Sequence, residues 1–125
     1  MPVVYRIDAT RGVIYTRCIG QVTLNEVLSH LRELAQDPAC PDRLHVLLDL
    51  SECTSIPESG QLQDITGQIG KVSSRVRFGR CAIVAPTDVL FGMSRMFGVF
   101  AEGWFQEVGV FRTREEVGLW PESAG

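Results

Sequence analysis

The feature of the sequence that most limits its fold is the regular alternation of strand-like and helix-like segments. Two short β-branched runs, Val3–Asp8 and residues 13–19, flank Ala-Thr-Arg-Gly and predict a hairpin that turns near Gly12. Helical and strand patterns then alternate, in the order β-β-α-β-α-β-α-β-α. Such alternation favours a mostly parallel sheet with right-handed crossovers, and the hairpin adds an antiparallel strand. The sequence predicts a single α/β domain with a mixed five-stranded sheet and about four helices.

The helices are predicted from capping signals and apolar spacing. The first opens at Thr23, where Glu26 completes a capping box, and its apolar stripe places His30 on the opposite side, as a solvated surface histidine. A second helix ends near Gly70, a third spans residues 90–105, and a last one opens with Thr113 and Glu116. The predicted core stripes of the first two helices are Val27, Leu28, Leu31, Leu34 and Ala35, then Leu62, Ile65, Ile69 and Val72.

The remaining strands are short apolar runs. Residues 46–50 and 81–85 are almost uninterrupted in their apolar character, as expected of strands buried on both faces. A last short strand is predicted at 108–111. We expect one domain over residues 1–120 and a C-terminal tail at 121–125.

Charge and hydropathy exclude several classes of function. The chain has 125 residues and a net charge of −3 at pH 7, which argues against nucleic acid as a partner. It lacks a run of about 18 apolar residues, so no membrane span is predicted. The first residues do not resemble a signal peptide. We therefore expect a cytoplasmic protein, in which Lys71, Arg75, Arg77 and Arg80 form a solvated basic segment or, alternatively, contact an anion or acidic partner.

Motifs for catalysis or metal binding are not found. Cys18, Cys40, Cys53 and Cys81 form no C-x-x-C pair, so we expect neither a metal site nor a cofactor. Ser59 lacks the glycine two residues earlier that a nucleophile elbow requires, because Pro57 is there. The sequence therefore predicts a protein that is not an enzyme.

Aromatic and methionine residues are concentrated in the third predicted helix. Five of them share one helical face and are expected to pack on the sheet: Met93, Met96, Phe97, Phe100 and Trp104. The same spacing puts Phe91 and Phe105 on the opposite, exposed flank. Because exposed apolar patches usually mark a binding surface, we expect homodimerisation there, with a small apolar ligand as the second interpretation.

The segment at residues 49–60, with Asp49-Leu50-Ser51 followed by Ser59-Gly60 at a helix start, resembles the switch region of STAS domains. The helix start Phe91-Gly92 and the ending Glu116-Val117-x-x-Trp120 resemble the SpoIIAA-like branch, which is grouped with CRAL-TRIO lipid-binding folds. The resemblance covers nearly the whole chain. It implies a regulatory switch formed by Asp49, Ser51, Ser55, Glu58, Ser59 and Gly60.

The resemblance also implies a phosphate-accepting serine, but Glu58 stands at that position here. Two interpretations of Glu58 stay open: it supplies a fixed negative charge, or it forms a capping box with Ser55. Ser59 is a substitute acceptor, because a helix N-terminus favours phosphate.

Two functions are predicted from these observations. The first is a non-enzymatic, STAS-like regulatory or protein-interaction module that works as a homodimer, with a regulatory protein as its partner. The alternative is a carrier or sensor of a small apolar ligand or lipid, bound in a pocket under the third helix that Met93, Phe97, Phe100 and Trp104 line.

Overall fold

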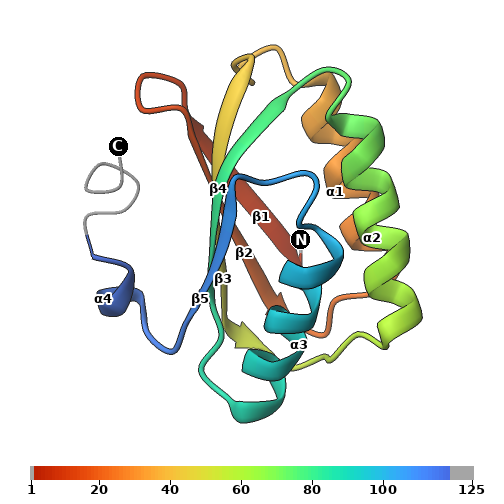
Figure 1. Ribbon diagram of the computed structural model, residues 1–125, viewed down its shortest axis with the longest axis vertical. Helices are drawn as coiled ribbons and strands as arrows, with labels where there is room; N and C mark the ends of the chain where they lie inside the picture. The colour runs from red at the N-terminus through yellow and green to blue at the C-terminus, as the bar shows by residue number, and fades with distance from the viewer. Residues whose placement is uncertain (1, 119–125) are drawn as a thin grey trace.

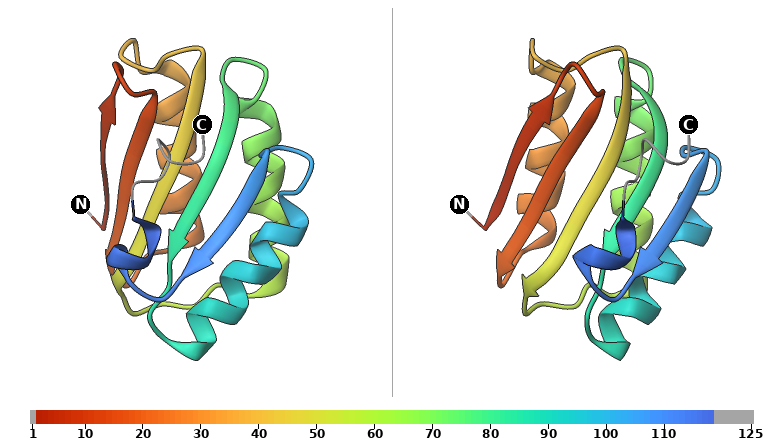
Figure 2. Two further views of the ribbon diagram at one scale, coloured as in Figure 1. Left: turned by 60° about the vertical axis from the view of Figure 1, so that its left-hand side comes forward. Right: turned by 90° about the vertical axis from the view of Figure 1, so that its left-hand side faces the viewer.

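The computed structural model describes residues 2–118, which form a five-stranded sheet with helices on both faces. The strands lie side by side in chain order; β1 is antiparallel to β2, and all other neighbours are parallel. Three long helices cover one face and a short fourth helix lies on the other (Figures 1 and 2). The predicted fold class and element order are confirmed.

The elements have the following bounds. The strands are β1 (Val3–Asp8), β2 (Val13–Gly20), β3 (Arg43–Cys53), β4 (Arg77–Val84) and β5 (Glu107–Phe111). The helices are α1 (Leu24–Gln36), α2 (Ser59–Val72), α3 (Asp88–Phe100) and α4 (Arg114–Val117). Trp120 and the predicted tail at 121–125 lie outside the described residues. Within residues 2–118 no helix has the length and apolar character needed to cross a bilayer.

Local signals account for the hairpin and for two helix starts. Gly12 has a φ of 67°, which a glycine adopts without strain, and its N–H donates to the Asp8 carbonyl at 2.8 Å. Thr23 and Glu26 exchange two hydrogen bonds across the first turn of α1, at 2.8 and 3.2 Å. The predicted capping box of α4, Thr113 with Glu116, is also present.

Other element ends differ from the prediction. The helix α2 continues to Val72, so Gly70 does not cap it. The strand β4 begins at Arg77, four residues before the predicted start at residue 81. The helix α3 ends at Phe100 rather than at residue 105, because the chain turns toward β5, where the Gln106 N–H donates to the Gly79 carbonyl at 2.8 Å.

The central strand β3 packs differently on its two faces. On the face that carries α4, Leu47 is only 3% exposed and packs with Val13, Ala82, Val84 and Val117. On the other face, Val46, Leu48 and Leu50 are only half-buried, although three helices cover them. The prediction that residues 46–50 are buried on both faces therefore holds for Leu47 only. The helical layer does not fill the space above β3.

Candidate functional site

A cavity of about 450 Å³ lies between the sheet and the three long helices. The half-buried side chains Val46, Leu48 and Leu50 form part of its lining on β3. Strands β2 and β4 and helices α1, α2 and α3 supply other walls. The cavity therefore explains why central side chains that the helices cover are still accessible.

The walls of the cavity are apolar and uncharged. Most lining side chains are aliphatic or aromatic, and no Lys, Arg, Asp or Glu belongs to the lining that the structure describes. Polar groups are few, and they include the hydroxyls of the buried residues Thr16 and Ser94 and the imidazole of His30. A wall of this kind favours an apolar molecule with few polar groups.

The cavity opens near the loops that lead into α1 and α2. Among the described lining residues, Thr23 and Ile56 are exposed, and both lie in these loops. Ser55 ties the two loops together, because its Oγ accepts from the Val22 N–H at 2.9 Å and donates to the Val22 carbonyl at 3.2 Å. The loops follow the carboxyl ends of β2 and β3, which is where α/β sheets commonly bind ligands.

The predicted switch residues occupy the same end of the sheet. The Asp49 carboxylate accepts from the N–H of Ser51 at 2.9 Å, and Glu58, Ser59 and Gly60 are exposed where α2 begins. The predicted capping box between Ser55 and Glu58 is wrong, because Glu58 is itself the residue that precedes the helix. Its N–H donates to the Gln61 side chain at 3.0 Å.

The residues predicted along the third helix separate into different environments. Met93 and Phe97 line the cavity, as the ligand hypothesis predicts, whereas Phe100 and Trp104 do not. Met96 and Trp104 are exposed, at 40% and 42%, so the prediction that they share a core face is wrong.

Phe105 is buried rather than exposed. Its ring packs against those of Phe78 and Phe97, with centroids 5.1 and 6.4 Å away, and it lines the cavity. The prediction of an exposed Phe105 is wrong because α3 ends at Phe100, so helical spacing does not apply beyond it. Phe91 is half-buried, with the Arg112 guanidinium 4.2 Å from its ring centre.

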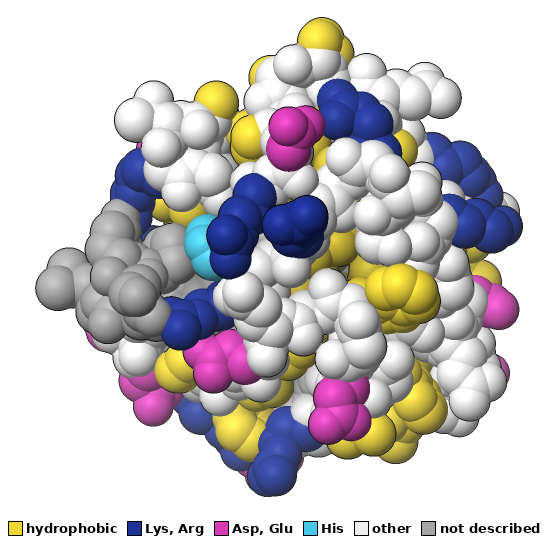
Figure 3. Space-filling view, turned by 45° about the horizontal axis from the view of Figure 1, so that its top comes forward, with side chains coloured by type: hydrophobic (Ala, Val, Ile, Leu, Met, Phe, Trp, Pro, Cys, Tyr) yellow, Lys and Arg dark blue, Asp and Glu magenta, His cyan; other side chains and the backbone are white. Residues whose placement is uncertain are grey.

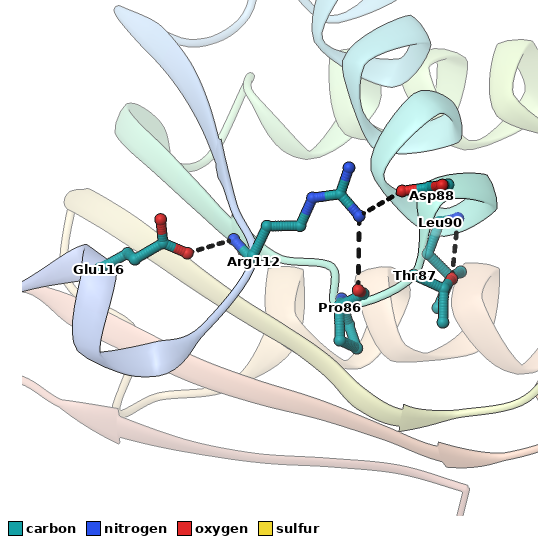
Figure 4. Close-up of polar contacts among 6 residues, drawn as sticks. All are labelled: Pro86, Thr87, Asp88, Leu90, Arg112 and Glu116. Atoms are coloured by element: carbon teal, nitrogen blue, oxygen red, sulfur yellow. Dashed lines mark hydrogen bonds and ion pairs between the residues drawn. The ribbon is translucent and has the colours of Figure 1, made fainter.

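Arg112 joins the end of β5 to two helices (Figure 4). Its Nη1 donates to the Asp88 carboxylate at 2.8 Å and to the Pro86 carbonyl at 3.4 Å, at the start of α3. Its backbone N–H donates to the Glu116 carboxylate at 2.9 Å, at α4. The cluster is satisfied by its own contacts, so it connects elements and does not offer a free binding group.

His30 lines the cavity, and the prediction that it is a solvated surface residue is wrong. Its ring packs against that of Tyr5, with centroids 5.0 Å apart, and its Nδ1 is buried and has no hydrogen-bond partner among the described residues. Burial lowers the pKa of His30 to about 4. The sequence did hold a signal for this position, because His30 follows Val27 by three residues and precedes Leu34 by four.

The second histidine has a structural role. The pairing of β3 with β4 shifts register near His45, and its Nδ1 accepts from the Arg80 N–H at 2.9 Å. Burial, with the nearby charges of Arg43 and Arg80, lowers the pKa of His45. Its ring also lies where a side chain on Gly79 would be, since an added Cβ would come within 2.5 Å of it.

The cysteines are free, and most are buried. Burial raises the pKa of both Cys18 and Cys81 to about 12, which makes them poor nucleophiles. Cys40, in the loop between α1 and β3, is 5% exposed. Cys53 is half-buried.

Several cations lie close together at the opposite end of the sheet, where β3 and β4 begin (Figure 3). Lys71, Arg75 and Arg77 are exposed, as predicted, whereas Arg80 pairs with Glu107 at 3.4 Å. Carboxylates are also visible on this face, so its charge is mixed.

The cavity is the candidate site: it is uncharged and opens beside the loops at the carboxyl ends of β2 and β3. No protein-family model matches the sequence, and no curated protein matches it either.

Proposed function

We propose that this protein binds a small, largely apolar ligand in the cavity between its sheet and helices α1, α2 and α3. The observation that carries the proposal is an uncharged space of about 450 Å³ above the half-buried side chains of the central strand. Ligand sites commonly enclose about 300–1,000 Å³ behind mostly apolar walls. The function is that of a carrier or sensor.

The size of the cavity sets the size of the ligand. An apolar cavity of about 150 Å³ holds one benzene molecule, so this cavity has room for about three times that. An occupant of matching size that binds only the folded state stabilises the fold.

The test is a binding titration with N-phenyl-1-naphthylamine, a neutral probe of linked aromatic rings that fluoresces strongly only in apolar surroundings. We expect saturable binding of one probe per chain, with a dissociation constant in the micromolar range, on the order of −8 kcal/mol. A rise in melting temperature with probe concentration is the second readout, since a ligand that binds only the folded state stabilises it. Fluorescence that rises linearly without saturation would count against the proposal.

A second candidate is the STAS-like interaction module, acting as a homodimer or with a regulatory partner. Exposed apolar side chains support it: Val89, Met96 and Val99 lie on one side of α3, and Val99 is 68% exposed. The exposed Glu58 and Ser59 at the start of α2, together with the resemblance of residues 49–60 to STAS switch regions, are consistent with a regulatory surface.

For this candidate we expect sedimentation velocity to show a dimer that Val99→Asp converts to a monomer, because a buried, unpaired carboxylate opposes association. Asp replaces an exposed side chain here, so the fold is kept. Phe105→Asp is unsuitable for this test, because Phe105 is buried and the variant would unfold. A wild-type protein that sediments as a monomer at all concentrations would contradict the homodimer.

A further inference from the structure

We infer that the ligand is uncharged and carries one hydrogen-bonding group, a hydroxyl or a carbonyl, which bonds to the imidazole of His30. This inference rests on the proposed function. The polar side chains of the lining fall into two groups: those near the opening, which are hydrogen-bonded to neighbouring residues, and Thr16, His30 and Ser94, to which the described residues supply no side-chain hydrogen bond.

Polar side chains near the opening are already engaged. Ser55 bonds to both backbone groups of Val22. The Gln61 side chain accepts from the Glu58 N–H. The Cys53 thiol donates to the Ser55 carbonyl at 3.5 Å. Ser55 and Cys53 therefore have little capacity left for a ligand, and the Oε1 of Gln61 is held in its contact with Glu58.

His30 differs from them, because its ring lines the cavity and its Nδ1 is buried without a partner among the described residues. Since Nδ1 is enclosed and no hydrogen bond of it fixes the tautomer of the ring, the other ring nitrogen, Nε2, is the one that can donate to a ligand carbonyl or accept from a ligand hydroxyl.

Contacts with Tyr5 also hold the imidazole ring of His30 in place. Tyr5 packs against it at 5.0 Å, and the Tyr5 hydroxyl donates to the Asp37 carboxylate at 2.7 Å. Asp37 in turn caps the end of α1, the helix that carries His30. A polar group whose packing restrains it in this way is a better recognition element than a free surface side chain.

An ionised ligand is disfavoured by the absence of charge. No Lys, Arg, Asp or Glu is among the described lining residues, so a buried carboxylate or ammonium would have no counter-charge. The lowered pKa of His30 keeps its imidazole neutral at pH 7. A neutral amphiphile, such as an alcohol, a phenol or a ketone, fits the cavity better than a fatty-acid anion.

The test uses three compounds that share one apolar body: 4-hexylphenol, hexylbenzene and 4-hexylbenzoate. Each displaces N-phenyl-1-naphthylamine from the wild type, from His30→Phe and from Thr16→Val. His30→Phe keeps a ring against Tyr5 and removes the hydrogen bonding. Thr16→Val removes another hydroxyl that lines the cavity and keeps the shape, so it is the matched control.

We expect the wild type to bind 4-hexylphenol about five- to tenfold more tightly than hexylbenzene, and 4-hexylbenzoate at least about tenfold more weakly than the phenol. His30→Phe should abolish the preference for the phenol, and Thr16→Val should retain it. A preference that survives in His30→Phe, that is lost in Thr16→Val, or that favours the benzoate would overturn the inference. Binding of hexylbenzene without any such preference would overturn it while leaving the proposed function standing. Failure of the probe and all three compounds to bind would remove both.

Discussion

Replacing Leu48 by Trp is expected to weaken binding of N-phenyl-1-naphthylamine at least tenfold without destabilising the protein. Leu48 lies on the central strand, is half-buried and lines the cavity. A larger side chain there occupies space that the ligand needs, and a tenfold loss corresponds to about 1.4 kcal/mol. Because the added atoms enter an existing cavity, we expect the free energy of unfolding to be unchanged or higher.

The adjacent residue supplies the matched control. Leu47 points to the other face of β3, where it is 3% exposed in a packed cluster with Val13 and Val84. The variant Leu47→Trp overpacks this cluster and should lower the free energy of unfolding by about 1–3 kcal/mol. Binding per folded molecule should be retained.

The two variants are compared by urea unfolding and by probe titration under the same conditions. We expect opposite effects: Leu48→Trp loses binding and keeps stability, whereas Leu47→Trp loses stability and keeps binding. Equal destabilisation by both variants would mean that no space exists above Leu48.

The second large effect is a loss of stability on mild acidification, to which His30 contributes about 3 kcal/mol. Burial lowers the pKa of His30 from 6.5 to about 4 in the folded protein. Between these values the unfolded chain binds a proton that the folded protein does not. The contribution is therefore fully present above pH 6.5 and is lost as the pH falls to about 4.

Urea unfolding of the wild type and of His30→Phe, at intervals from pH 7.5 to 4, isolates this contribution. His45, whose pKa is also lowered, and the carboxylates titrate in both proteins, so they cancel in the difference. We expect the two stability curves to separate progressively below pH 6.5, with the wild type losing more. Parallel curves would show that His30 is solvated and would also remove it from the cavity wall.

Elements with local signals were predictable from the sequence. The hairpin at Gly12 and the capping boxes at Thr23 and Thr113 depend on residues within four positions of one another, and the structure has all of them. The end of α3 was not predictable in this way. It depends on where the chain joins β5, next to a strand that precedes it by more than twenty residues.

The candidate site was predictable only in part. Met93 and Phe97 were expected under the ligand hypothesis and do line the cavity. His30 was assigned to the wrong environment because helical periodicity describes one helix at a time. Its surroundings depend on Tyr5 from β1 and on how far the helices stand from the sheet. A cavity is a property of packed layers, and no short segment of sequence encodes it.

The most direct test of the proposed function is to locate the bound probe by methyl NMR during a titration with N-phenyl-1-naphthylamine. Aromatic rings shift the resonances of methyl groups that they contact. We predict saturable shifts for Val46, Leu48 and Leu50, and none for Leu47 or the exposed Val99. Shifts confined to Val89 and Val99 on the outside of α3, or no shifts at all, would contradict a ligand-binding cavity beneath the helices.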